Sequence, residues 1–85
     1  MLSDSEIAQY HDRGYVSPDF KLPADTLAEI RADHDRLLAR YPEFRDNCSD
    51  LLGFDTGFLN YARNPEILDM VAQLIGPDIA LWNMS

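Results

Sequence analysis

The sequence predicts a mainly helical chain with two short β-strands. Three helix starts, each marked by a capping residue or a proline, precede apolar residues at helical spacing. Gly14 and Gly76 stand where two of these helices should end, because glycine tolerates the left-handed backbone. The apolar segments that follow them, Tyr15-Val16 and Ile79–Met84, read as strands. A length of 85 residues allows one domain at most.

A capping box predicts that the first helix begins just after Ser3. Ser3 is the N-cap and Glu6 occupies the third helical position, so each side chain can accept from the other's backbone N–H. Leu2 and Ile7 are spaced for a hydrophobic staple across this helix start. We expect the helix to run to Gly14.

The second helix is expected to start at Pro23, which loses no hydrogen bond at a first helical position. Asp25 lies in the first turn of this helix, where acidic residues are favoured by the helix dipole. Pro42 should end the helix at Tyr41. Its expected buried stripe consists of Leu27, Ile30, His34, Leu37, Leu38 and Tyr41.

The stretch from Pro42 to Arg63 is the least regular part of the sequence. Residues 46–50 read as a loop, and residues 56–63 as a short helix that packs the rings of Phe54, Phe58 and Tyr61.

Asn64 and Pro65 then mark a clear helix start, with Asn64 as N-cap and Pro65 at the first position. The expected buried face consists of Ile67, Leu68, Val71, Leu74 and Ile75. Ile79–Met84 is apolar on both faces except at Asn83, a pattern typical of a strand covered on both sides.

Composition narrows the classes of function. The net charge of −8 argues against binding nucleic acid or an anionic membrane surface. Cys48 is the only cysteine, so neither an intrachain disulfide nor a cysteine zinc site is expected. Residues 1–6 lack a basic, apolar leader, and no run approaches the ~20 apolar residues of a membrane span. We therefore expect a cytoplasmic protein.

The sequence supplies no catalytic, cofactor-binding or metal-binding residue. A facial-triad iron site needs His-x-Asp/Glu, but Arg13 and Arg36 follow His11 and His34 at that spacing. His34 is expected to be a half-buried histidine with its hydrogen bonds satisfied. Acidic neighbours around Cys48 disfavour a thiolate nucleophile. Trp82 and the other aromatic residues are expected in the core.

Three segments in order resemble the N-terminal region of the phytanoyl-CoA dioxygenase family of iron(II)/2-oxoglutarate oxygenases. Leu2–Val16 (LSDSEIAQYHDRGYV) is similar to the opening helix and Gly-Tyr-Val strand of that family. Leu22–Leu38 is similar to its second helix. Asn64–Trp82 (NPEILDMVAQLIGPDIALW) is similar to its Asn-Pro helix, Gly-Pro-Asp stop and strand ending in Leu-Trp.

The resemblance implies a double-stranded β-helix, or jelly-roll, enzyme that hydroxylates C–H bonds of a small-molecule substrate. Residues 1–76 would be its helical cap and residues 79–84 its first core strand, making the chain a single partial domain. The implied iron(II) ligands and 2-oxoglutarate contacts lie after Ser85. We therefore expect this chain by itself to bind neither cofactor and to be inactive.

Two other interpretations remain open at this point. The chain could be a small acidic helical interaction module, in which Ile79–Met84 pairs with the sheet edge of a partner protein. It could also be a small acidic metal-binding protein, although no ligand spacing supports that interpretation.

Overall fold

The computed structural model describes all 85 residues, Met1–Ser85; 61% of them are helical and none forms a β-strand. The predicted mainly helical class is therefore confirmed. The chain divides into two compact units, one made of residues 1–21 and 63–80 and the other of residues 22–62 and 81–85. The interpretation of the chain as one partial domain stays a prediction.

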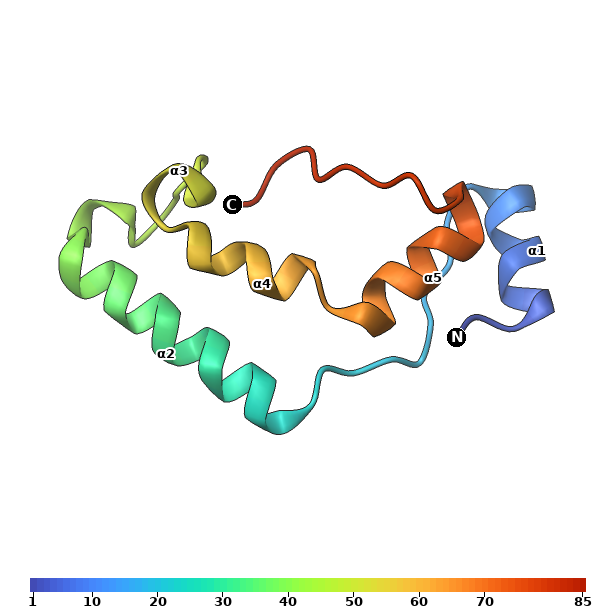
Figure 1. The fold of residues 1–85 in the computed structure, drawn as a ribbon, viewed down its shortest axis with the longest axis horizontal. Coiled ribbons are helices and arrows are strands. Elements are labelled where there is room, and N and C mark those ends of the chain that lie inside the picture. Colours follow the sequence, from blue (N-terminus) through green and yellow to red (C-terminus); the bar gives the residue numbers. More distant parts are fainter. The chain divides into compact units, whose positions relative to one another are not determined.

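The first unit contains α1 (Asp4–Arg13), which begins and ends as the sequence predicts (Figure 1). The Ser3 hydroxyl accepts a hydrogen bond from the Glu6 backbone N–H at 3.2 Å. The Glu6 carboxylate accepts from the Ser3 N–H at 2.9 Å, which completes the capping box. Gly14 ends the helix with a left-handed φ of 82° and donates its N–H to the Tyr10 carbonyl.

The same unit contains α5 (Pro65–Ile75), whose boundaries are also the predicted ones. The Asn64 side-chain oxygen accepts from the backbone N–H groups of Glu66, at 2.9 Å, and Ile67, at 3.3 Å. Gly76 ends the helix with a positive φ of 89°. Local side-chain and backbone chemistry therefore defines both ends of both helices in this unit.

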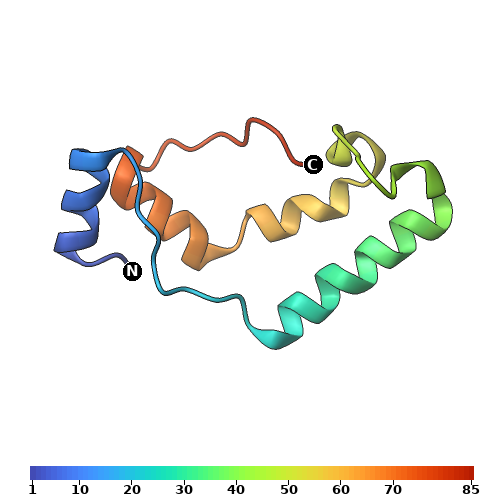
Figure 2. The ribbon, with the colours of Figure 1, turned by 180° about the vertical axis from the view of Figure 1, so that it is seen from behind.

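α1 and α5 contact each other (Figures 1 and 2). Leu2, next to the start of α1, is only 6% exposed. The Gln73 side-chain amide on α5 accepts from the Leu2 N–H at 2.8 Å and donates to the Leu2 carbonyl at 3.2 Å. One glutamine thus satisfies both backbone groups of the residue that is buried at this contact.

The second unit is built around α2 (Ala24–Arg40), which ends at Tyr41 as predicted. Pro23 is the residue before the helix rather than its first member. After α2 come the 3₁₀ turn η1 (Pro42–Phe44), the one-turn helix α3 (Leu51–Phe54), a second 3₁₀ turn η2 (Thr56–Phe58) and α4 (Leu59–Ala62). The last two form the predicted short helix, whereas α3 was not predicted.

The core of the second unit is small. Leu37 of α2, Leu51 of α3 and Phe58 of η2 are the buried members. Five half-buried residues pack around them: Tyr41, Cys48, Leu52, Tyr61 and Met84. At the edge of the core, the Tyr61 hydroxyl donates to the Asp33 carboxylate. This hydrogen bond joins α4 to α2.

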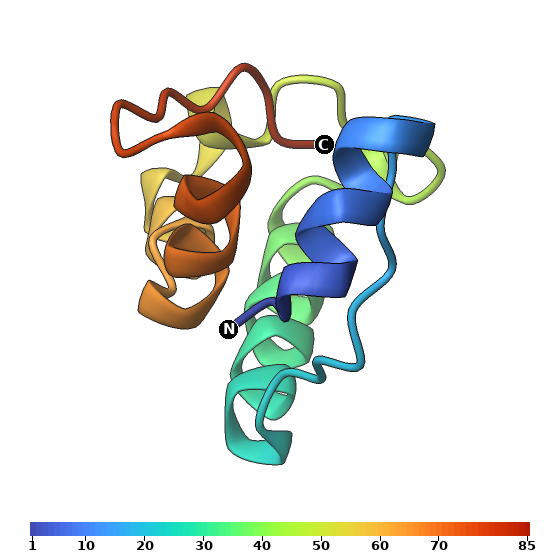
Figure 3. The same ribbon diagram turned by 90° about the vertical axis from the view of Figure 1, so that its right-hand side faces the viewer.

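Two sequence predictions about strands are wrong for this chain. Neither Tyr15-Val16 nor Ile79–Met84 forms a strand, and Figure 3 shows the segment after α5 as open chain. A strand exists only as part of a ladder, and neither segment has an adjacent strand with which to pair.

The predicted buried faces of two helices also need correction. No residue of α5 is fully buried: Ile67, Leu68, Val71 and Leu74 on its expected inner face are half-buried, and Ile75 is 59% exposed. On α2 only Leu37 is buried, while Leu27 is 39% exposed. Periodicity located the apolar stripes correctly, but a stripe is buried only where another element covers it.

Candidate functional site

The cleft that carries most functional groups lies in the second unit, over its small core. It has a volume of about 260 Å³. Its floor includes Leu37, Leu51 and Phe58. Its polar lining residues are His34, Arg45, Asp46, Asn47, Cys48 and Ser85.

His34 is more exposed than the sequence predicts. Its side chain is 58% exposed, and its Nδ1 atom lies 3.9 Å from a carboxylate oxygen of the adjacent Asp35. The expected half-buried, satisfied histidine is therefore wrong. The physical reason is that the core covers α2 at Leu37, one turn further along, and leaves the helix open around His34.

Cys48 packs as a small apolar side chain. It is half-buried and contacts the Leu37, Leu51 and Phe58 cluster. No buried side-chain nitrogen or oxygen in the chain lacks a hydrogen-bond partner.

The residues of this chain do not fit an iron(II) site. No group of three His, Cys, Asp or Glu side chains comes together. His11 is exposed on α1 and its ring stacks edge-on against Tyr10, with ring centroids 5.6 Å apart. Asp33 pairs with Arg36 and Tyr61 rather than with another acid. We assign no catalytic step to these residues.

A second, more apolar cleft of about 290 Å³ borders the same core and shares His34, Leu51, Phe58 and Ser85 with the first. Ile30, Phe58, Tyr61 and Met84 contribute to its walls. The Met84 carbonyl accepts a hydrogen bond from the Leu51 N–H at 3.1 Å. It is the only backbone hydrogen bond that residues 79–84 make to another part of the chain, so this segment is held at Met84.

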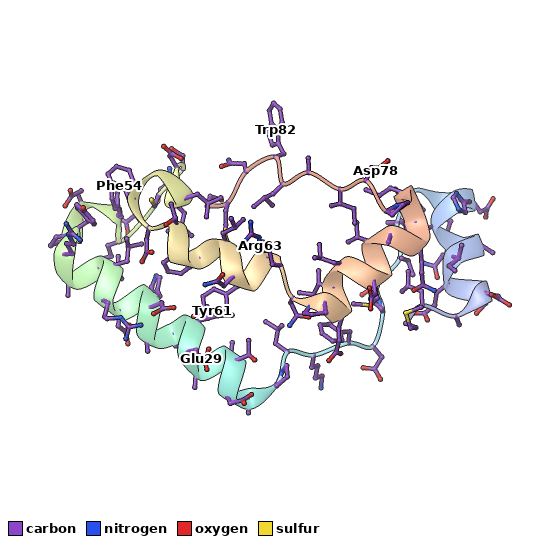
Figure 4. All side chains as sticks on the ribbon, in the orientation of Figure 1. Glu29, Phe54, Tyr61, Arg63, Asp78 and Trp82 are labelled. Carbon is purple, nitrogen blue, oxygen red and sulfur yellow. The ribbon has the colours of Figure 1, made fainter.

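The segment before this anchor is apolar and uncovered. Trp82 is 98% exposed and Leu81 is 47% exposed. Figure 4 shows the Trp82 ring pointing outward from the backbone of its own segment. The expectation that Trp82 is a core residue is therefore wrong for these 85 residues.

Sequence reasoning missed α3 and the aromatic cluster that it forms with the end of α2. α3 has four residues, and Asp50 before it makes no side-chain capping bond. The only signal in the sequence was the spacing of large rings, at Tyr41, Phe44 and Phe54.

No protein-family model matches the chain, and neither a curated protein nor a solved structure matches it. None of the helices is both long enough and apolar enough to cross a lipid bilayer.

Proposed function

We propose that this chain is the N-terminal part of an iron(II)/2-oxoglutarate-dependent dioxygenase of the phytanoyl-CoA dioxygenase family. In this proposal the helices form a cap, and Ile79–Met84 becomes the first strand of a jelly-roll core supplied by following residues. The whole protein would be cytoplasmic and would hydroxylate a small-molecule substrate. The support comes from the three ordered sequence segments given above and from the exposure of the last segment.

The single observation that carries the proposal is the exposure of Trp82. Burial of a tryptophan side chain removes about 150–250 Å² from water, which contributes about 4–6 kcal/mol at 25 cal/mol per Å². In the 85-residue chain this contribution is absent, because Trp82 is 98% exposed. A sheet packed over residues 79–84 would supply it, together with partners for their unpaired backbone groups.

The groups that do the chemistry would lie outside this chain. Since its own side chains do not fit an iron site, its role in the proposal is to cover the core and to supply one strand. The 85-residue chain should therefore show no saturable heat on titration with iron(II) and 2-oxoglutarate. A stoichiometric micromolar site for both would contradict the proposal.

The decisive test is the coding DNA downstream of Ser85 in the source genome. We expect one reading frame to encode a lysine, then His-x-Asp, then a distal histidine and an arginine. A locus without this series in any frame would remove the oxygenase assignment.

A second test compares Trp82→Ser in the longer protein and in the 85-residue chain. In the longer protein the change should cost about 3–5 kcal/mol, as expected for a large buried ring. In the 85-residue chain it should change the free energy of unfolding by less than about 0.5 kcal/mol, as for other surface positions. Equal effects in both proteins would mean that no following segment covers Trp82.

The same exposed segment also favours a second candidate, an interaction module whose residues 79–84 add to the sheet edge of a partner protein. This function needs no metal and no following catalytic segment. It predicts a compact monomer with a single cooperative melting transition. Aggregation of the purified 85-residue chain would favour the oxygenase fragment instead, because its uncovered strand would pair non-specifically.

A further inference from the structure

A third groove, which the proposed function does not use, lies at the C-terminal end of α2 within the second unit. It has a volume of about 360 Å³. The lining residues are Arg36, Leu37, Arg40, Tyr41, Phe54 and Asp55. The groove therefore combines two guanidinium groups, one turn apart on α2, with aromatic rings.

The aromatic side of the groove is a cluster of three rings. Tyr41, Phe44 and Phe54 have centroids 5.4, 5.3 and 4.6 Å apart, and each pair is tilted or edge-on. Phe54, the last residue of α3, is 46% exposed and is labelled in Figure 4. Edge-on packing fixes the rings against one another and leaves part of Phe54 available to a further ring.

The two arginines differ in their partners. Arg36 forms an ion pair with Asp33 on the preceding turn. Arg40 pairs with no carboxylate; its guanidinium carbon lies 5.3 Å from the centroid of the Tyr41 ring. Asp55, across the groove, accepts a hydrogen bond from the Gly57 N–H at 2.9 Å. Arg40 thus provides a guanidinium that forms no ion pair beside the half-exposed Phe54 ring, while the Asp55 carboxylate keeps its negative charge on the other wall of the groove.

The surrounding charge limits which anion can bind. Four of the seven basic residues fall between positions 31 and 45, yet the chain as a whole carries a net charge of −8. One unpaired guanidinium can balance a single negative charge, whereas a polyanion would meet repulsion from the rest of the chain.

We propose that this groove binds a small monoanionic ligand with a flat apolar ring, of the aryl carboxylate class. The carboxylate bonds to the Arg40 guanidinium, which can donate two parallel hydrogen bonds. The ring packs on Phe54 and Tyr41. The groove does not involve residues 79–85, so this binding does not depend on the oxygenase assignment.

The test is a ¹⁵N-NMR titration of the 85-residue chain with three probes of one shape: phenylacetate, 2-phenylacetamide and phenethylamine. They carry charges of −1, 0 and +1 on the same ring. Phenylacetate should shift the amides of residues 36–41 and 54–55, with a dissociation constant on the order of millimolar for about ten heavy atoms. The amide should bind about fivefold more weakly, which is the upper range for one exposed ion pair. The amine should bind more weakly still.

Arg40→Gln should weaken phenylacetate binding about fivefold and leave 2-phenylacetamide binding unchanged. Arg31→Gln is the matched control, because it removes the same charge from the same helix but does not line the groove. Phe54→Leu should weaken the binding of both probes.

Three results would overturn the proposal. The first is equal affinity for all three probes, which would indicate an apolar patch without charge recognition. The second is an equal loss of phenylacetate affinity in Arg40→Gln and Arg31→Gln, which would indicate that only the overall electrostatic field of the chain attracts the anion. The third is amide shifts confined to residues outside the groove.

Discussion

The two units of this protein are stabilised in different ways. In the first, side-chain and backbone caps define both ends of α1 and α5, while the helices share only one buried residue, Leu2. In the second, neither α2 nor α3 has a side-chain cap, but Leu37, Leu51 and Phe58 form a buried cluster. Local caps therefore define the helix ends of the first unit, whose two helices are joined through the Leu2–Gln73 hydrogen bonds, whereas an apolar cluster joins the elements of the second.

The strongest test of this difference between the units is Phe58→Ala, which removes the ring at the centre of the second unit's core. Phe58 is 4% exposed, so the loss of its ring should cost about 3–5 kcal/mol. Amide hydrogen exchange should accelerate throughout α2 and α4 but remain slow in α1. Phe54→Ala is the matched control: Phe54 is 46% exposed, and we expect no more than about half of that cost. Equal costs would refute the assignment of Phe58 to the core.

The corresponding change in the first unit is Leu2→Ala, with an expected cost of about 2–3 kcal/mol. Leu2 is 6% exposed, and amide exchange should accelerate in α1 and α5 together. Ile75→Ala removes an apolar side chain that is 59% exposed and should have little effect. If Ile75→Ala were the more damaging variant, the apolar face of α5 would be covered in solution.

A smaller effect tests the caps. Asn64→Ala removes the side chain that accepts two backbone hydrogen bonds at the start of α5, and should cost about 1 kcal/mol in thermal or urea unfolding. Asn60→Ala is the control, because Asn60 is exposed within α4 and forms no side-chain hydrogen bond. A loss of stability in Asn60→Ala as large as in Asn64→Ala would disprove the capping role.

The smallest effect concerns the pH dependence of α1. The Ser3 backbone N–H, and then the Ser3 hydroxyl, lower the pKa of Glu6 below its usual 4.5. A carboxyl group whose pKa is lowered by folding stabilises the folded state above its unfolded pKa. That stabilisation is lost as the pH falls through the folded pKa. The helicity of α1 should therefore decline below about pH 4.5.

The matched variants for this test are Ser3→Ala and Ser3→Thr. In each variant, ¹³C-NMR titration of the Glu6 carboxyl group measures its pKa. Ser3→Ala should raise the pKa of Glu6 toward its usual value, since the hydroxyl and the geometry of the cap are lost. Ser3→Thr keeps a hydroxyl and should leave the pKa low. An unchanged pKa of Glu6 in Ser3→Ala would show that the Ser3 hydroxyl does not lower it in solution.

Sequence patterns predicted most helix boundaries because the relevant interactions span four residues or fewer. Ser3 and Asn64 as caps, and Gly14 and Gly76 as stops, are all confirmed. The one-turn helix α3 escaped prediction because it has no such signal and depends on packing of Leu51 against the core. The groove beside Phe54 escaped for the same reason, since its walls come from two separate elements.

The amino-acid sequence by itself determined where the main helices begin and end, which stripes are apolar and how strongly acidic the chain is. The tertiary structure decided which stripes are buried, that His34 and Trp82 are exposed, and that Ile79–Met84 remains unpaired. The physical reason is the range of the interactions. A cap needs only its neighbours in sequence, whereas burial and strand pairing need a second surface whose presence no local pattern encodes.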